Sequence, residues 1–304
     1  GGAFAWCANR ARRNKHRMRL AGLLALLAAL SAQPLSIARL SDALSEPGGT
    51  FDTDNLISNE AAYLDAIPAL EKARLKGGVY IGVGPEQNFS YVAALQPALA
   101  LIVDLRRDNL LEHLLLKAII EQATDRAGYL ALLMGRELPR LPADAPIETI
   151  VKAVERAPRV DLDEAGLLKR IAGYGFALDK GDVRTITRFW RTFAKQGFRL
   201  KFESFNRGPR AYHPDWRELV LARDSKDRAS GFFGSDAAFQ RVKLMQAGHR
   251  IVPVTGNLAG KQAMAAIARY LREHDLKVNA VYVSNVEQYL FRERGTFEQY
   301  LDNL

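Results

Sequence analysis

Cysteine is almost missing from this chain, which holds Cys7 as the single cysteine among its 304 residues. Cys7 precedes the apolar run Leu20–Leu30, so the chain after that run can form no disulfide, thiolate nucleophile or cysteine metal site. The histidines are also few, and none is paired with another at the three- or four-residue spacing of a helical metal site. They are His16, His113, His213, His249 and His274. The sequence therefore predicts no metal centre, and only His213 falls in a loop expected to face a site.

Two signatures of common active sites are missing as well. No Gly-x-Ser-x-Gly elbow is present to carry a serine nucleophile, and no Gly-x-x-x-x-Gly-Lys-Ser/Thr loop is present to hold phosphates. The sequence therefore argues against a serine hydrolase of that type and against a P-loop nucleotide hydrolase.

Excess positive charge is confined to the start of the chain. The net charge is +9, but residues 1–40 hold seven of the 43 lysines and arginines and no acidic residue. The remainder has 36 basic against 34 acidic side chains, a net charge of +2. Because a nucleic-acid-binding surface needs a local basic patch, this near-neutral distribution predicts no nucleic-acid partner.

Long hydrophobic runs are absent, since Leu20–Leu30 is too short for a comfortable permanent membrane span. A basic stretch before this run and small residues after it are the parts of a secretory signal. We expect residues 1–32 to be an export signal, with Met18 as the true start and residues 1–17 upstream of it. The protein would then be periplasmic or secreted and would meet the membrane only through this leader before cleavage. An organelle-targeted or a cytoplasmic protein is the alternative.

A glycine turn between two apolar runs organises the rest of the chain. Val79–Val83 is predicted to be a buried strand, and Gly82, Gly84 and the following proline require a tight turn at its end. The next apolar run, Leu99–Val103, ends in Asp104. Strand, glycine turn, helix, strand and acidic end form the first half of a nucleotide-binding βαβ unit. The third glycine of the dinucleotide fingerprint is replaced by Gln87, which disfavours an NAD-dependent oxidoreductase.

The remaining patterns predict one α/β domain over residues 55–304, preceded by a linker over 33–54. Further strands are expected at 251–254 and 278–283, with a helix at 261–274 between them. Residues 125–197 lack strand patterns and are predicted to be a helical insertion. The aromatic and basic stretch 198–205 is predicted to be an edge strand. The fold class is therefore a Rossmann-like, mostly parallel sheet with a helical insertion.

Polar groups follow each of the four predicted core strands, and their order resembles the ligand-binding corners of class I S-adenosylmethionine-dependent methyltransferases. The stretch 284–290, Ser-Asn-Val-Glu-Gln-Tyr-Leu, is similar to the strand-four corner of small-molecule methyltransferases. Together with the stretches 82–88 and 104–107, it looks closer still to an uncharacterised bacterial family of exported proteins with the same core. The resemblance covers roughly residues 55–295.

The resemblance implies a site at the ends of the strands. It implies that the glycine turn holds the methionine part of S-adenosylmethionine, that Asp104 holds the ribose, that the end of the third strand lies near the adenine, and that the fourth strand faces the acceptor. The implied cofactor-binding residues are Gly82, Gly84, Gln87, Asn88, Asp104, Arg106, Gly256, Asn257, Ser284 and Asn285. Candidate catalytic residues are Glu86, Asn285 and Glu287, because carboxylates suit acid–base or amine-binding work.

Three features of this chain depart from the methyltransferase pattern. Asn257 stands where these enzymes usually carry aspartate. The sequence stops shortly after the fourth core strand, so either the C-terminus is truncated or the stretch 198–205 completes the sheet. S-adenosylmethionine is a cytosolic metabolite, which an exported enzyme would lack. Two hypotheses follow: a methyltransferase-like protein acting on an unknown small acceptor, or an exported non-enzymatic protein that binds a metabolite or a protein partner.

Overall fold

A parallel sheet forms the centre of the chain in the computed structural model, which describes residues 36–53, 55–142, 144–204, 210, 212–291 and 295–303. The sheet has four strands in the order β3-β2-β1-β4. They are β1 (Val79–Gly82), β2 (Leu99–Asp104), β3 (Ile251–Thr255) and β4 (Val278–Tyr282), and all their pairings are parallel. Every residue of β1, β2 and β3 is buried, as expected of apolar strands covered on both faces. The predicted strands and the α/β class are confirmed.

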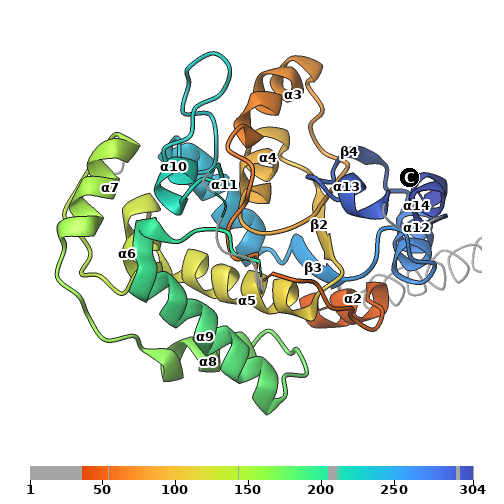
Figure 1. Cartoon of the computed structure of the whole chain (residues 1–304), viewed down its shortest axis with the longest axis horizontal. Coiled ribbons are helices and arrows are strands. Elements are labelled where there is room, and N and C mark those ends of the chain that lie inside the picture. Colours follow the sequence, from red (N-terminus) through yellow and green to blue (C-terminus); the bar gives the residue numbers. More distant parts are fainter. Residues whose placement is uncertain are drawn as a thin grey trace, which may run out of the picture. The chain divides into compact units, whose positions relative to one another are not determined.

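Helices connect the strands and cover the sheet (Figure 1). The helix α4 (Asn88–Leu95) joins β1 to β2, and α5 (Arg107–Gln122) follows β2. Both pack against α11 (Asp236–Ala247), which leads into β3. The helix α12 (Ala263–Glu273) joins β3 to β4. Because all four strands are parallel, their carboxyl ends lie along one edge of the sheet. The strand order reverses direction between β1 and β4, and open α/β sheets bind ligands at the carboxyl edge beside such a reversal.

The predicted linker contains a helix. α2 (Ile37–Leu44) contacts β3 and α12, and Ser36 caps its first turn by accepting the backbone N–H of Arg39. Its buried residues are Ile37, Ala38, Leu40, Ser41 and Leu44, a spacing that places them on one helical face. This stripe outweighs the flanking prolines and glycines that suggested a linker. The predicted leader over residues 1–32 lies outside the described residues.

Helices also fill the stretch expected to be an insertion. They are α6 (Arg126–Leu133), α7 (Ile147–Arg156), α8 (Glu164–Ala172) and α9 (Lys180–Gln196). Shorter elements complete the chain: η1 (Tyr63–Ala66), α3 (Ile67–Ala73), η2 (Gly197–Arg199), α10 (Trp216–Val220), α13 (Glu287–Leu290) and α14 (Thr296–Asn303). In the part of the chain that the structure describes, no helix is long and apolar enough to cross a membrane.

The prediction of an edge strand at 198–205 is wrong for its described residues. They form η2 and two isolated antiparallel bridges, Lys201 with Asp215 and Thr53 with Ser204, and they do not join the sheet. Phe198 instead packs on α10, where its ring is stacked on that of Trp216 with centroids 5.4 Å apart. Packing of Phe198 on a helix rather than alternation across a sheet explains the apolar pattern.

Candidate functional site

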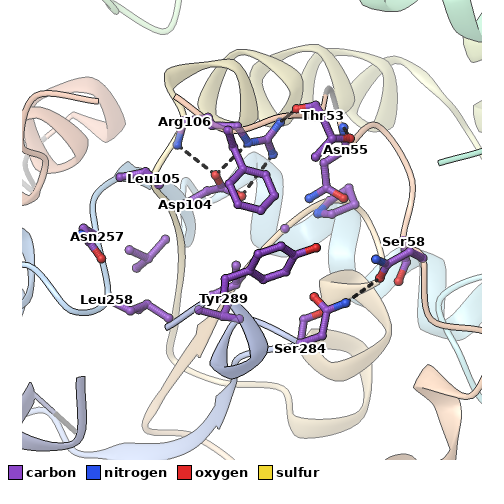
Figure 2. A pocket seen from close by; sticks show the side chains of 18 of the residues that line it. Thr53, Asn55, Ser58, Asp104, Leu105, Arg106, Asn257, Leu258, Ser284 and Tyr289 are labelled. Atoms are coloured by element: carbon purple, nitrogen blue, oxygen red, sulfur yellow. Dashed lines mark hydrogen bonds and ion pairs between the residues drawn. The ribbon is translucent and has the colours of Figure 1, made fainter. Parts of the chain in front are cut away.

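A cavity of about 150 Å³ lies at the carboxyl edge of the sheet (Figure 2). This volume is the space open to the centre of a water molecule, and one water needs about 10–15 Å³ of it. The cavity therefore has room for about ten waters, which is the scale of one small molecule. The ends of all four strands contribute to its wall, together with Phe51, Thr53, Asn55, Ser58 and Asn59 from before β1. The polar lining residues are Thr53, Asn55, Ser58, Asn59, Gln87, Asp104, Arg106, Asn257, Ser284, Asn285 and Tyr289.

The glycine turn after β1 is held from below by the amide of Asn88. Its Nδ2 donates to the carbonyl oxygens of Val83 at 2.9 Å, Gly84 at 3.1 Å and Pro85 at 2.8 Å, and its Oδ1 accepts from the Tyr80 hydroxyl at 2.7 Å. A Cβ on Gly82 would lie 2.0 Å from this Oδ1. Gly82 and Asn88 therefore shape the turn without lining the cavity.

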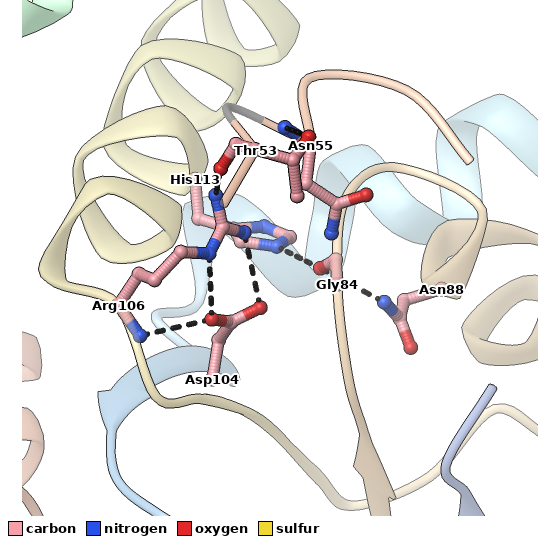
Figure 3. A network of polar contacts seen from close by, with 7 residues as sticks. All are labelled: Thr53, Asn55, Gly84, Asn88, Asp104, Arg106 and His113. Atoms are coloured by element: carbon pink, nitrogen blue, oxygen red, sulfur yellow. Dashed lines mark hydrogen bonds and ion pairs between the residues drawn. The ribbon is translucent and has the colours of Figure 1, made fainter. Parts of the chain in front are cut away.

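Gly84 itself lines the cavity and has a φ of +87°, a conformation that favours glycine. Its carbonyl oxygen also accepts from His113 Nε2 at 2.9 Å (Figure 3). Burial lowers the pKa of His113 to about 4, so the ring is neutral near pH 7 with its proton on Nε2. Of the histidines, only His213 was predicted to fall in a loop facing a site. His213 instead packs against the rings of Phe202 and Tyr212 and does not line the cavity.

Asp104, at the end of β2, is engaged by Arg106 two residues later. Its Oδ1 accepts from the Arg106 backbone N–H at 2.9 Å and from Nε at 3.2 Å, while Oδ2 accepts from Nη2 at 3.2 Å. The guanidinium also donates through Nη1 to the carbonyl oxygen of Thr53 at 2.9 Å (Figure 3). Asp104 is 8% exposed and Arg106 is 5% exposed. They are the only ionised side chains in the cavity wall among the described residues, and they neutralise each other.

Residues 45–53, which we call the N-terminal strap, run over the ends of β2 and β3. The Glu46 backbone N–H donates to the Thr255 carbonyl at 2.9 Å, and the Gly49 N–H donates to the Leu105 carbonyl at 2.8 Å. The Glu46 carboxylate accepts the backbone N–H groups of Asn257 at 2.7 Å and Ala263 at 3.0 Å. The loop after β3, where the resemblance places adenine recognition, is therefore held by this chain's own carboxylate.

The corner after β4 closes the cavity from the other side. Ser284 has a φ of +52°, and Asn285 Nδ2 donates to Asn59 Oδ1 at 3.4 Å. The Tyr289 ring reaches across the cavity (Figure 2) and meets Phe51 of the strap edge-on, with centroids 4.8 Å apart and an interplanar angle of 73°. Part of this wall is therefore aromatic.

The two candidate catalytic glutamates lie away from the cavity. Glu287 is exposed and accepts from the Tyr300 hydroxyl at 3.3 Å. Glu86 is buried in the core, where its carboxylate accepts from the Tyr129 hydroxyl at 2.9 Å and from the indole N–H of Trp216. Burial raises the pKa of Glu86 to about 7. Neither carboxylate is positioned to act on a ligand in the cavity.

The structure brings together most of the predicted cofactor-binding residues. The lining includes Gly84, Gln87, Asp104, Arg106, Gly256, Asn257, Ser284 and Asn285. Sequence reasoning missed the lining residues before β1 and in the 198–205 stretch, which are Phe51, Thr53, Asn55, Ser58, Asn59 and Phe202. The run of Asn and Ser between 55 and 59 was the available signal. Within the described residues, no group of three or more His, Cys, Asp or Glu side chains is arranged to hold a metal ion.

The sheet and its cavity define an α/β protein with a Rossmann-like layout and a small-molecule-sized site at the carboxyl edge. The family described as "Domain of unknown function (DUF7790)" matches residues 56–304, and the chain belongs to this family. A comparison with curated proteins finds no match. The matched range includes the whole sheet and begins after the N-terminal strap.

Proposed function

We propose that this chain is a methyltransferase-like protein that binds S-adenosylmethionine in the cavity at the carboxyl edge. The observation that carries the proposal is the convergence of all four strand ends, in the order β3-β2-β1-β4, on one cavity. Gly84, Asp104, Asn257 and Asn285 line this cavity, in the places where the resemblance puts the methionine, ribose, adenine and acceptor contacts.

The chemistry of the lining supports binding of one such molecule. Gly84 offers backbone without a side chain, and the buried Gln87 Oε1 has no hydrogen-bond donor among the described residues. An N–H or O–H group of a ligand would satisfy this acceptor. The bound cofactor would supply the activated methyl group. This chain's residues would align the acceptor and exclude water, which suits a transfer that needs no base, because no carboxylate besides Asp104 lines the cavity among the described residues.

A second function, an exported non-enzymatic protein that binds a metabolite or protein partner, is favoured by a different observation. Arg106 occupies both oxygens of the implied ribose carboxylate, and Glu46 occupies the implied adenine loop. A protein that had lost the enzymatic role could keep these internal contacts. The predicted leader fits this alternative.

Isothermal titration of S-adenosylmethionine and S-adenosylhomocysteine into the full chain tests the first proposal. We expect a dissociation constant in the micromolar range, weakened about tenfold or more by Asp104→Asn, because hydrogen bonds to a charged group are worth roughly 1.5–3 kcal/mol. Gly84→Val should also weaken binding, since its φ of +87° strains a β-branched side chain. Asp65→Asn, an exposed change on η1, is the matched control.

Absence of binding by folded protein would overturn the cofactor proposal and favour the second function. Cell fractionation then separates the two further, because a cleaved periplasmic protein agrees with the second function and a retained cytosolic one with the first.

A further inference from the structure

We infer that Arg106 is a specificity-determining residue that competes with a ligand's hydroxyl groups for Asp104. This inference rests on the proposed function, in which the Asp104 carboxylate receives a ribose. Three hydrogen bonds from Arg106 already reach the carboxylate: two at Oδ1 from the backbone N–H and Nε, and one at Oδ2 from Nη2. The bare carboxylate could accept about four hydrogen bonds.

A vicinal diol needs two acceptor positions if both of its hydroxyls donate to the carboxylate. With three of about four positions occupied, the wild-type carboxylate can accept only one of them. The guanidinium must therefore leave at least one oxygen before Asp104 can bind a ribose through both hydroxyls. Charge-assisted hydrogen bonds between buried partners are strong, and both residues are nearly buried. Displacing Arg106 from Asp104 therefore costs free energy, which the ligand's own contacts must offset.

The same guanidinium connects the site to the N-terminal strap. Arg106 Nη1 donates to the Thr53 carbonyl at 2.9 Å, and Thr53 is further held by its hydroxyl, which donates to the Glu203 carbonyl at 2.5 Å. The strap therefore keeps an attachment when Arg106 moves. The Arg106 guanidinium thus donates to Asp104 through Nε and Nη2 and to the strap through Nη1. These contacts hold it beside the implied ribose contact.

The chain offers a matched control in the next residue. Arg107 also forms a bidentate pair with a carboxylate, donating from Nε to Asp182 Oδ1 at 2.9 Å and from Nη2 to Oδ2 at 2.7 Å. Neither Arg107 nor Asp182 lines the cavity. Removing the guanidinium of Arg107 therefore changes charge and an ion pair without touching the competition for Asp104.

The test compares adenosine with 2′,3′-dideoxyadenosine, which lacks the diol, by isothermal titration into wild type, Arg106→Met and Arg107→Met. We expect Arg106→Met to bind adenosine about tenfold tighter than wild type. The ratio of the 2′,3′-dideoxyadenosine dissociation constant to the adenosine dissociation constant should be about tenfold larger in Arg106→Met than in wild type, and it should stay at the wild-type value in Arg107→Met. Asp104→Asn combined with Arg106→Met should abolish the gain, because the competed carboxylate is then gone.

If Arg106→Met does not fold, Arg106→Gln replaces it, because glutamine can donate to one oxygen of Asp104 and leave the other free. The inference is overturned if wild type binds adenosine and the folded Arg106 variant binds it no tighter, with an unchanged diol ratio. That result leaves the proposed function standing. If neither protein binds either nucleoside, S-adenosylmethionine or S-adenosylhomocysteine, the proposed function fails and the inference fails with it.

Discussion

Replacing Asn88 with alanine is expected to lower the free energy of unfolding by about 2–4 kcal/mol, as measured by urea denaturation. The change removes three hydrogen bonds to the carbonyls of the glycine turn and leaves the buried Tyr80 hydroxyl without its acceptor. A buried polar group left unpaired costs about 1–3 kcal/mol, and the lost side-chain volume adds to this cost. The same variant should weaken any ligand that depends on the conformation of Gly84.

Two further substitutions test whether the loss of stability comes from the hydrogen bonds of the Asn88 amide. Asn88→Asp keeps an acceptor for Tyr80 but places a buried carboxylate against three carbonyl oxygens, so it should be more destabilising than alanine. Asn279→Ala removes an amide that donates to the Gly77 carbonyl at 3.0 Å in a partly exposed position, and it should cost less than about 1 kcal/mol. A loss below about 1 kcal/mol for Asn88→Ala would contradict the assigned role of this amide.

Replacing Glu86 with glutamine is expected to make the protein more stable than wild type above neutral pH but not at pH 4.5. Burial raises the pKa of Glu86 to about 7 from the ordinary value of 4.5, so the folded state holds a proton that the unfolded state releases between these values. Wild-type stability from this group is therefore fully present below about pH 4.5 and is lost as pH rises through about 7. The loss is about 3 kcal/mol, and glutamine avoids it because it does not ionise.

His113 makes the free energy of unfolding depend on pH with the opposite sign. Its pKa is lowered by burial to about 4 from 6.5, so its contribution is present above about pH 6.5 and is lost as pH falls through about 4. The two slopes oppose each other between about pH 4.5 and 6.5 in wild type, whereas Glu86→Gln leaves only the His113 slope. Urea denaturation of both proteins at pH 5 and pH 8 measures the difference, and a difference independent of pH would contradict the burial of an ionisable Glu86.

The sheet could be predicted from the sequence because its strands are short apolar runs followed by glycine or polar residues. Val79–Gly82 and Leu99–Asp104 are buried along their whole length, so local pattern and final environment agree. Gly84 and Asp104 were identified for the same reason, since each directly follows or ends such a run. The partners of these residues could not be read from the pattern. For example, Arg106 binds both oxygens of Asp104, and this contact depends on side-chain geometry within the turn.

The misplaced predictions share a different physical cause, which is long-range packing. Glu86 was predicted to be a candidate catalytic carboxylate, but Tyr129 and Trp216, which enclose it in the core, lie far away in the sequence. The segment before residue 54 looked like a linker because its prolines and glycines were weighed above the stripe on Ile37–Leu44. The strap reaches the site through contacts such as Glu46 with Asn257, which no local pattern indicates.

Hydrogen–deuterium exchange of the full chain with and without saturating S-adenosylhomocysteine tests the central claim most directly. Binding at the carboxyl edge should slow exchange of the backbone amides at 83–88, 104–107, 256–258 and 284–290, where the ends of the four strands meet the cavity. Exchange in α8 (Glu164–Ala172), none of whose residues line the cavity, should not change. Protection of these four segments with unchanged exchange in α8 is the predicted result. Unchanged exchange in all four segments, or protection only in segments that do not line the cavity, would contradict an adenosyl-binding site at this edge.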